Sequence, residues 1–167
     1  MIVGDPFRKM LCCEAVNRRL EWILAPGFTV TGSYAIVSQF GAAGQRMHAG
    51  PWYNWGHHYR SPRSGCPPLR SPGLNLGWAL RDVNTDLGDG GVMIIPGSHK
   101  MRRPIPLPPT QSCDLPQVRH INFKAGDVIV YMGGQTTHGV KAWRADHERR
   151  FVATKVSLPR RTASARL

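Results

Sequence analysis

Two of the histidines in this chain stand where a metal ion could be bound. His48 lies in MHAGP, at the start of a long irregular stretch, and His138 lies in QTTHGV, directly after an apolar segment. A neutral imidazole is a good ligand for iron, and its pKa of about 6.5 leaves it mostly deprotonated at neutral pH. Either residue alone is more often an ordinary polar side chain, so the hypothesis depends on what accompanies the pair.

An arginine follows the second histidine at a suggestive spacing. Arg149 stands 11 residues beyond His138 (149 − 138), and two antiparallel strands joined by a loop would return its guanidinium to the histidine. A guanidinium grips a carboxylate through two parallel hydrogen bonds, which lysine cannot do. The pair could therefore hold a dicarboxylate, with a metal at one end and Arg149 at the other. Because side chains alternate along a strand, Arg150 is expected on the opposite face.

A carboxylate is missing where many iron enzymes have one. That position is two residues after the first histidine, and here it is Gly50. The residues alone leave three readings: a metal site that has lost a ligand, a metal site that works without it, or no metal site.

A helix is expected ahead of these residues. Residues 6–24 have a rough apolar stripe, Pro6 suits a first helical turn, and Asp5 is the expected N-cap. The segment APG at 25–27 should end the helix.

Short strands should follow the helix and position the candidate site. Residues 41–73 read as a loop, and KAG at 124–126 predicts a hairpin turn. The β-branched and aromatic segments are 28–40, 74–83, 92–97, 119–123, 127–132, 138–142 and 150–158. A helix followed by mostly antiparallel strands favours a β-sandwich or jelly roll and argues against a doubly wound parallel sheet.

Composition limits the class of protein. The chain has 167 residues, 41% of them hydrophobic, which predicts one domain over residues 1–158 and a basic, disordered tail at 159–167. The net charge of +12 comes from scattered arginines, without a basic helix or interleaved aromatic residues. We therefore expect a solvated basic surface and no specific nucleic-acid binding.

The cysteines and the apolar segments suggest a compartment. None of the four cysteines forms a C-x-x-C pair, and reduced thiols are expected. The N-terminus shows no apolar signal segment, and no apolar run reaches 18 residues. A cytoplasmic protein without a membrane partner is the expectation.

Longer motifs in the chain resemble a known enzyme family. The stretches MHAGP, GWALRDVNTDLGDGGVMIIPGSHK, FKAGDVIVYMGGQTTHG and HERRFVATKVSLP are similar, in order, to the phytanoyl-CoA dioxygenase-like family of iron(II)/2-oxoglutarate-dependent oxygenases. With GDPFRKML and the first strand they cover most of residues 4–158. The resemblance implies a mainly β fold: a double-stranded β-helix, or jelly-roll barrel, closed around Fe(II). It also implies 2-oxoglutarate and O2 as co-substrates and a small-molecule substrate.

The resemblance assigns expected roles to individual residues. His48 and His138 would bind iron, and Arg149 would bind the far carboxylate of 2-oxoglutarate. Three further residues, His99, Trp78 and Asp82, match family positions near the site, although packing or turn support is the favoured role for each. The aromatic-rich segment 51–73 would form a lid or substrate wall.

Departures from the family pattern leave the reaction open. Gly50 occupies the usual position of the carboxylate ligand, and Val140 stands where a hydroxyl residue often follows the second histidine. The primary expectation is a hydroxylating oxygenase that uses water, or a carboxylate such as Asp82 or Asp86, in place of the missing ligand. One alternative is a 2-oxoglutarate-dependent halogenase, because related halogenases have Ala or Gly there and bind a halide on the iron. Another is a non-catalytic jelly-roll binding module.

Overall fold

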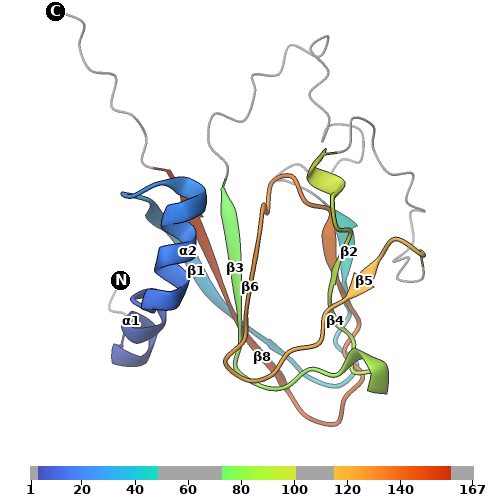
Figure 1. Ribbon diagram of the computed structural model, residues 1–167. Helices are drawn as coiled ribbons and strands as arrows, with labels where there is room; N and C mark the ends of the chain where they lie inside the picture. Colours follow the sequence, from blue (N-terminus) through green and yellow to red (C-terminus); the bar gives the residue numbers. More distant parts are fainter. Residues whose placement is uncertain (1–3, 49–72, 101–114, 159–167) are drawn as a thin grey trace, which may run out of the picture.

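Two four-stranded antiparallel sheets face each other in the computed structural model, which describes residues 4–48, 73–100 and 115–158 (Figure 1). The first sheet has the order β1 (Thr29–Ser38), β8 (Arg149–Ser157), β3 (Leu74–Ala79) and β6 (Val128–Tyr131). The second has the order β2 (Gln45–His48), β7 (His138–Lys141), β4 (Gly91–Ile94) and β5 (Arg119–His120). Strands that neighbour each other in the sequence mostly lie in opposite sheets, which is the jelly-roll arrangement. The predicted fold class is confirmed.

The predicted helix 6–24 is in fact two helices. They are α1 (Asp5–Leu11) and α2 (Glu14–Leu24), and the chain breaks between them because Cys13 takes an extended conformation as the N-cap of α2. Gly4, and not Asp5, is the N-cap of α1, while Asp5 lies in the first turn and pairs with Arg8. No helix in the described ranges is long and apolar enough to cross a membrane.

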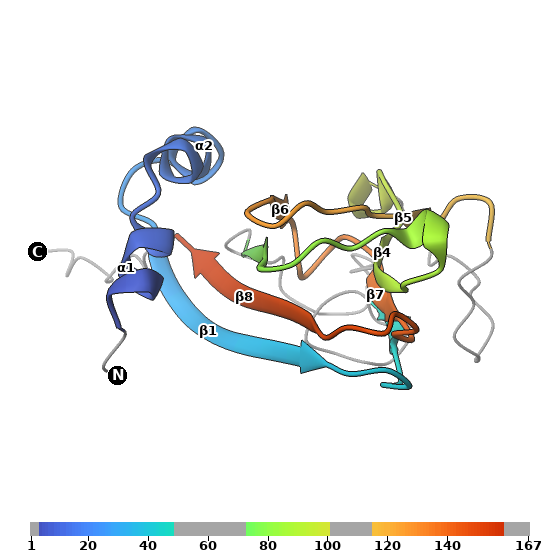
Figure 2. The ribbon, with the colours of Figure 1, turned by 90° about the horizontal axis from the view of Figure 1, so that it is seen from below.

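Helix α2 covers the outer face of the first sheet, on the side away from the second sheet (Figures 1 and 2). It buries Leu20 and Leu24 against alternate residues of β3 and β8. These strand residues are Leu74, Leu76, Trp78, Val152 and Val156. This outer core therefore fixes which faces of β3 and β8 are left to point into the barrel.

The barrel interior has a separate apolar core at one end. It is formed by Ala79, Val83, Val92, Phe123, Trp143, Ala145 and Phe151. Phe151 packs edge-on against Phe123, with ring centroids 5.6 Å apart. Gly77 lies beside the Phe151 ring so closely that a Cβ atom at this position would overlap it. Glycine in β3 therefore makes room for an aromatic side chain of β8.

Two sequence predictions about the connections are wrong. Strand β2 falls inside the segment 41–73 that reads as a loop. The turn at 124–126 joins no hairpin, because β5 and β6 belong to different sheets. Asp127 closes this turn by accepting the backbone N–H of Lys124 at 2.7 Å, and the turn carries the chain from one sheet to the other.

Among the described residues, two short 3-10 helices lie at opposite ends of the barrel. One is η2 (Thr85–Leu87), between β3 and β4, and the other is η3 (Ser98–Lys100), after β4 (Figure 1). The predicted tail 159–167, and residues 51–72 of the predicted lid, lie outside the described residues.

Candidate metal centre

The two candidate histidines are direct neighbours in one sheet. His48 ends β2, His138 begins β7, and the two are paired across these antiparallel strands. Their ring centroids are 4.3 Å apart, with 48° between the ring planes. His138 also pairs with Ile94, the last residue of β4, so both histidines lie on the sheet at the end where β4 leads into η3. The fold thus brings together two imidazoles that are 90 residues apart in the sequence (138 − 48).

The same ring nitrogen of each histidine is held by the backbone. Nδ1 of His48 lies 2.7 Å from the carbonyl oxygen of Arg46, and Nδ1 of His138 lies 2.8 Å from that of Thr136. A carbonyl only accepts, so Nδ1 carries a proton in both rings, and in the neutral His138 ring the lone pair is on Nε2. This tautomer is the one in which metal-binding histidines are typically held.

His138 is kept neutral by its surroundings. It is 8% exposed, and burial lowers the pKa of its imidazole to about 4. The hydrogen bond to Thr136 acts in the opposite direction, and the nearby His48 lowers this pKa further. A metal ligand must be deprotonated, so the ring is in the required state at neutral pH.

Sequence patterns did not identify Tyr131, which lies beside His138, or Asn75, which contacts Tyr131. The Tyr131 ring on β6 packs edge-on against His138, with centroids 4.7 Å apart, and Asn75 on β3 donates to the Tyr131 hydroxyl at 3.4 Å. Burial raises the pKa of Tyr131. Alternation along β6 could have identified Tyr131, because it shares a face with Ile129, which packs against the interior core.

Arg149 is a buried cation in the first sheet. Its side chain is 3% exposed, and Nε and Nη1 have no hydrogen-bond partner within the described ranges. The guanidinium carbon lies 5.6 Å from the centroid of Phe151, two residues along β8, so both side chains are on the interior face. Burial lowers the pKa of Arg149, yet a guanidinium stays protonated in proteins. Buried donors of this kind are normally satisfied, so an anionic group beside Arg149 would find two donors available for hydrogen bonding.

The strand pairing that places Arg149 in the barrel differs from the predicted pairing. Strands β7 and β8 do not pair, because β7 lies between β2 and β4 whereas β8 lies between β1 and β3. Arg149 therefore enters the interior from the sheet opposite His138. Alternation along the strand is observed: Arg150 is exposed and binds Glu148 through Nε and Nη2, at 2.9 and 2.8 Å.

The remaining predicted residues lie away from the histidine pair. Trp78 belongs to the outer core under α2, although its Nε1 has no partner among the residues described. Asp82 lies at the η2 end, where it accepts from the backbone N–H of Ala125 at 2.8 Å and from Nζ of Lys124 at 2.9 Å. The Lys124 hydrogen bond, followed by that from Ala125, lowers the pKa of Asp82.

Neither proposed replacement carboxylate lies beside the histidines. Asp82 supports the turn before β6, and Asp86 in η2 accepts from the Asn122 amide at 3.0 Å. Within the described part of the chain, no third His, Cys, Asp or Glu joins the pair in a group that could hold a metal ion. Gly50 lies outside the described residues. His99 is exposed, whereas its neighbour Ser98 is buried.

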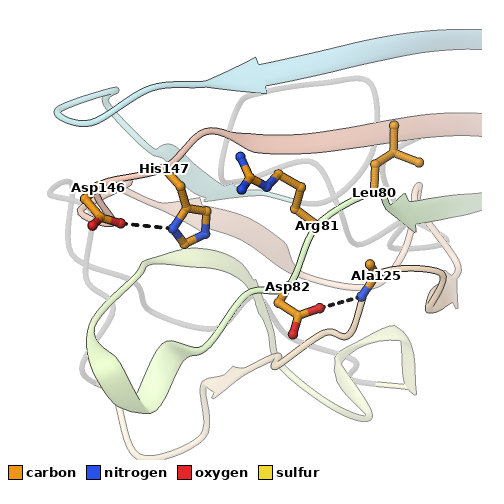
Figure 3. Close-up of a pocket in the computed structure, with 6 residues that line it drawn as sticks. All are labelled: Leu80, Arg81, Asp82, Ala125, Asp146 and His147. Carbon is orange, nitrogen blue, oxygen red and sulfur yellow. Dashed lines mark hydrogen bonds and ion pairs between the residues drawn. The ribbon is translucent and has the colours of Figure 1, made fainter.

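A shallow pocket at the η2 end is separate from the histidine pair. It has a volume of about 600 Å³ and is lined by Leu80, Arg81, Asp82, Ala125, Asp146 and His147 (Figure 3). Its charged groups interact with their own neighbours: Asp146 with Nδ1 of His147 at 3.2 Å, and Asp82 with Lys124. This pocket adds no group to the histidine pair.

Solved structures with the same fold include proteins that were solved with a metal bound. HygX from Streptomyces hygroscopicus, solved with nickel and 2-oxoglutarate bound, has a TM-score of 0.73 at 14% identity over 93% of this chain and 66% of its own. The non-haem monooxygenase ThoJ in complex with nickel has a TM-score of 0.67 at 15% identity over 95% and 56%. EvdMO1 has a TM-score of 0.64 at 21% identity over 91% and 32%. The chain thus spans about a third to two thirds of their lengths.

The family is shown by the sequence itself. No curated protein matches the sequence. The model of the phytanoyl-CoA dioxygenase family, however, matches residues 5–151, a range that includes both histidines and Arg149. Because this match covers most of the chain, the protein belongs to the phytanoyl-CoA dioxygenase family.

Proposed function

We propose that the protein is an iron(II)/2-oxoglutarate-dependent oxygenase that hydroxylates a small molecule. One observation carries this proposal: two adjacent imidazoles with backbone-held Nδ1 atoms share a barrel with a buried arginine, two of whose donors have no partner among the described residues. Family membership and the nickel- and 2-oxoglutarate-bound fold relative support it. The hygromycin B bound in another HygX structure supports a small-molecule substrate.

Each group would have a definite task. His48 and His138 would hold iron through Nε2, and Arg149 would bind the far carboxylate of 2-oxoglutarate through two parallel hydrogen bonds. Bound iron supplies the oxygen chemistry, in which O2 and 2-oxoglutarate yield succinate, carbon dioxide and a hydroxylated substrate. The chain would fix the imidazole tautomers and place the Arg149 charge against the co-substrate, and the apolar residues around Phe151 would limit the access of water.

The direct test is succinate formation. Purified protein with iron(II), 2-oxoglutarate and O2 should form succinate slowly even without a substrate, and His138→Ala should abolish this. His147→Ala is the matched control, because its ring lies at the other end of the barrel and should not affect turnover. Equal succinate formation by wild type and His138→Ala would remove the histidine pair from the reaction.

Gly50 favours a second candidate, a 2-oxoglutarate-dependent halogenase. Glycine brings no carboxylate to the metal, so a halide could take that coordination position. In a hydroxylase, Gly50→Asp should tighten metal binding and raise succinate formation, because it completes the two-histidine, one-carboxylate arrangement. In a halogenase, the wild-type rate should rise steeply with chloride and the same substitution should abolish this effect. Metal and 2-oxoglutarate binding without any succinate would instead indicate a binding module.

A further inference from the structure

We infer that Ser98 is a positioning residue that sets the tautomer and orientation of His138 through a single shared peptide group. Ser98 belongs to the PGSHK motif, and it is 5% exposed at the start of η3. The inference about orientation concerns the metal-free fold, and only its consequence for metal affinity rests on the proposed function.

Two hydrogen bonds meet on one peptide unit. The peptide between Thr136 and Thr137 donates its N–H, which belongs to Thr137, to the Ser98 hydroxyl at 2.8 Å. The carbonyl of the same peptide, which belongs to Thr136, accepts from Nδ1 of His138 at 2.8 Å. Because a peptide group is planar, its N–H and C=O cannot turn independently. Ser98 therefore fixes the direction in which the Thr136 carbonyl meets the imidazole.

The peptide between Thr136 and Thr137 lies beside buried residues, and its neighbours are held by other backbone hydrogen bonds. Thr136 and His138 are both buried, so water does not readily replace a lost partner. The backbone on both sides is anchored: Thr136 N–H donates to the Met132 carbonyl at 2.7 Å, and Ile95 N–H donates to the Thr137 carbonyl at 2.9 Å. Within this frame, the Thr137 N–H is the donor that depends on a side chain.

The position of Ser98 depends on the turn that precedes it. Gly97 has a φ of 77°, a conformation that side-chain-bearing residues rarely adopt, and it directs the chain into η3. Ser98 then points inward while His99 is exposed. In this motif the serine, and not the histidine, reaches the site. Its hydroxyl accepts a hydrogen bond from the backbone N–H of Thr137.

The test compares three variants with the wild type. Ser98→Ala removes the acceptor, Ser98→Thr retains it, and Ser98→Cys keeps the size but offers only a weak acceptor. Ser33→Ala is the matched control, because it removes a hydroxyl partner from Thr154, 3.3 Å away in the first sheet and far from the histidines.

The first measurement uses metal-free protein. Nitrogen-15 NMR of the His138 ring should show a single Nδ1–H tautomer in wild type, Ser98→Thr and Ser33→Ala. In Ser98→Ala the ring should lose this signature, and the Thr137 amide should exchange with solvent at least about ten times faster. An unchanged His138 tautomer in Ser98→Ala would overturn the inference, whatever the enzyme does. If Ser98→Ala does not fold, Ser98→Cys takes its place. An unchanged His138 tautomer and unchanged Thr137 amide exchange in Ser98→Cys would also overturn the inference.

The second measurement is nickel(II) affinity by calorimetry. Loss of a group that orients a ligand typically costs 10- to 100-fold in metal affinity, so Ser98→Ala should bind nickel weaker by about that factor. The nickel affinity of Ser98→Thr should stay within a few-fold of the wild-type value, and Ser33→Ala should bind nickel as tightly as wild type. Equal nickel affinity in wild type and Ser98→Ala would overturn this consequence. If the tautomer depends on Ser98 but the wild type binds no nickel, Ser98 still positions His138 and the proposed oxygenase function fails.

Discussion

Arg149→Met should stabilise the metal-free protein while abolishing 2-oxoglutarate binding. The wild-type guanidinium is buried with Nε and Nη1 unsatisfied within the described residues. Methionine has a similar length and no donors, and it can pack on Phe151, where the guanidinium now lies. If Arg149 served only for packing, its replacement would not both raise stability and abolish 2-oxoglutarate binding.

The expected magnitudes follow from the two unsatisfied donors. A buried donor without a partner costs about 1–3 kcal/mol. Imperfect packing of the methionine will offset part of this gain, so the free energy of unfolding of Arg149→Met should exceed that of wild type by at least about 1 kcal/mol. Arg149→Lys keeps a charge but loses the second parallel hydrogen bond. A hydrogen bond to a charged group is worth about 1.5–3 kcal/mol, so 2-oxoglutarate should bind this variant roughly 10- to 100-fold more weakly.

Urea unfolding and ligand-dependent melting test both effects. Without ligand, the Met variant should unfold at higher urea than wild type. With nickel(II), 2-oxoglutarate should raise the melting temperature of wild type but not that of the Met variant. Arg150→Met is the control, because Arg150 is exposed and pairs with Glu148, and it should respond to 2-oxoglutarate like wild type. A Met variant that is less stable and still responds to 2-oxoglutarate would refute the reasoning.

Two further predictions concern stability alone. His138 has a pKa of about 4 when folded and about 6.5 when unfolded, so below pH 6.5 the unfolded chain takes up the proton first. The metal-free protein should therefore lose up to roughly 3 kcal/mol between pH 6.5 and 4, and urea unfolding of His138→Gln should lack this component. Gly77→Ala should destabilise the fold by about 1–3 kcal/mol, because its Cβ would overlap the Phe151 ring. Gly32→Ala, whose Cβ would meet nothing within 4 Å, should change the urea midpoint far less.

Local patterns in the sequence predicted part of the site. Alternation correctly separated a buried Arg149 from an exposed Arg150, because the period of a strand is fixed by its backbone. The motifs selected the two histidines, which the fold places side by side. The break at Cys12–Cys13 was not visible, because no Gly or Pro marks it in the sequence.

What the sequence could not predict depends on non-local pairing. Strand β2 has four residues, too few to show a period, yet its pairing with β7 is what makes His48 the neighbour of His138. The hairpin between β7 and β8 failed as a prediction because consecutive strands in a jelly roll lie in opposite sheets. Ser98 was overlooked beside His99 because which of the two points inward is decided by η3.

On the proposed function, the charges of the bound groups would make Gly50 important. A divalent metal and the Arg149 cation together exceed the charge of the 2-oxoglutarate dianion by one positive charge, and the described residues bring no carboxylate to the histidines. A carboxylate ligand would cancel this excess, whereas glycine leaves it in a poorly solvated interior, where an uncompensated charge is costly. A bound anion is then favoured.

Chloride should tighten 2-oxoglutarate binding by nickel-loaded wild type but not by Gly50→Asp, even without substrate. Wild-type binding that is indifferent to chloride would mean that a carboxylate from elsewhere in the chain already balances the charge.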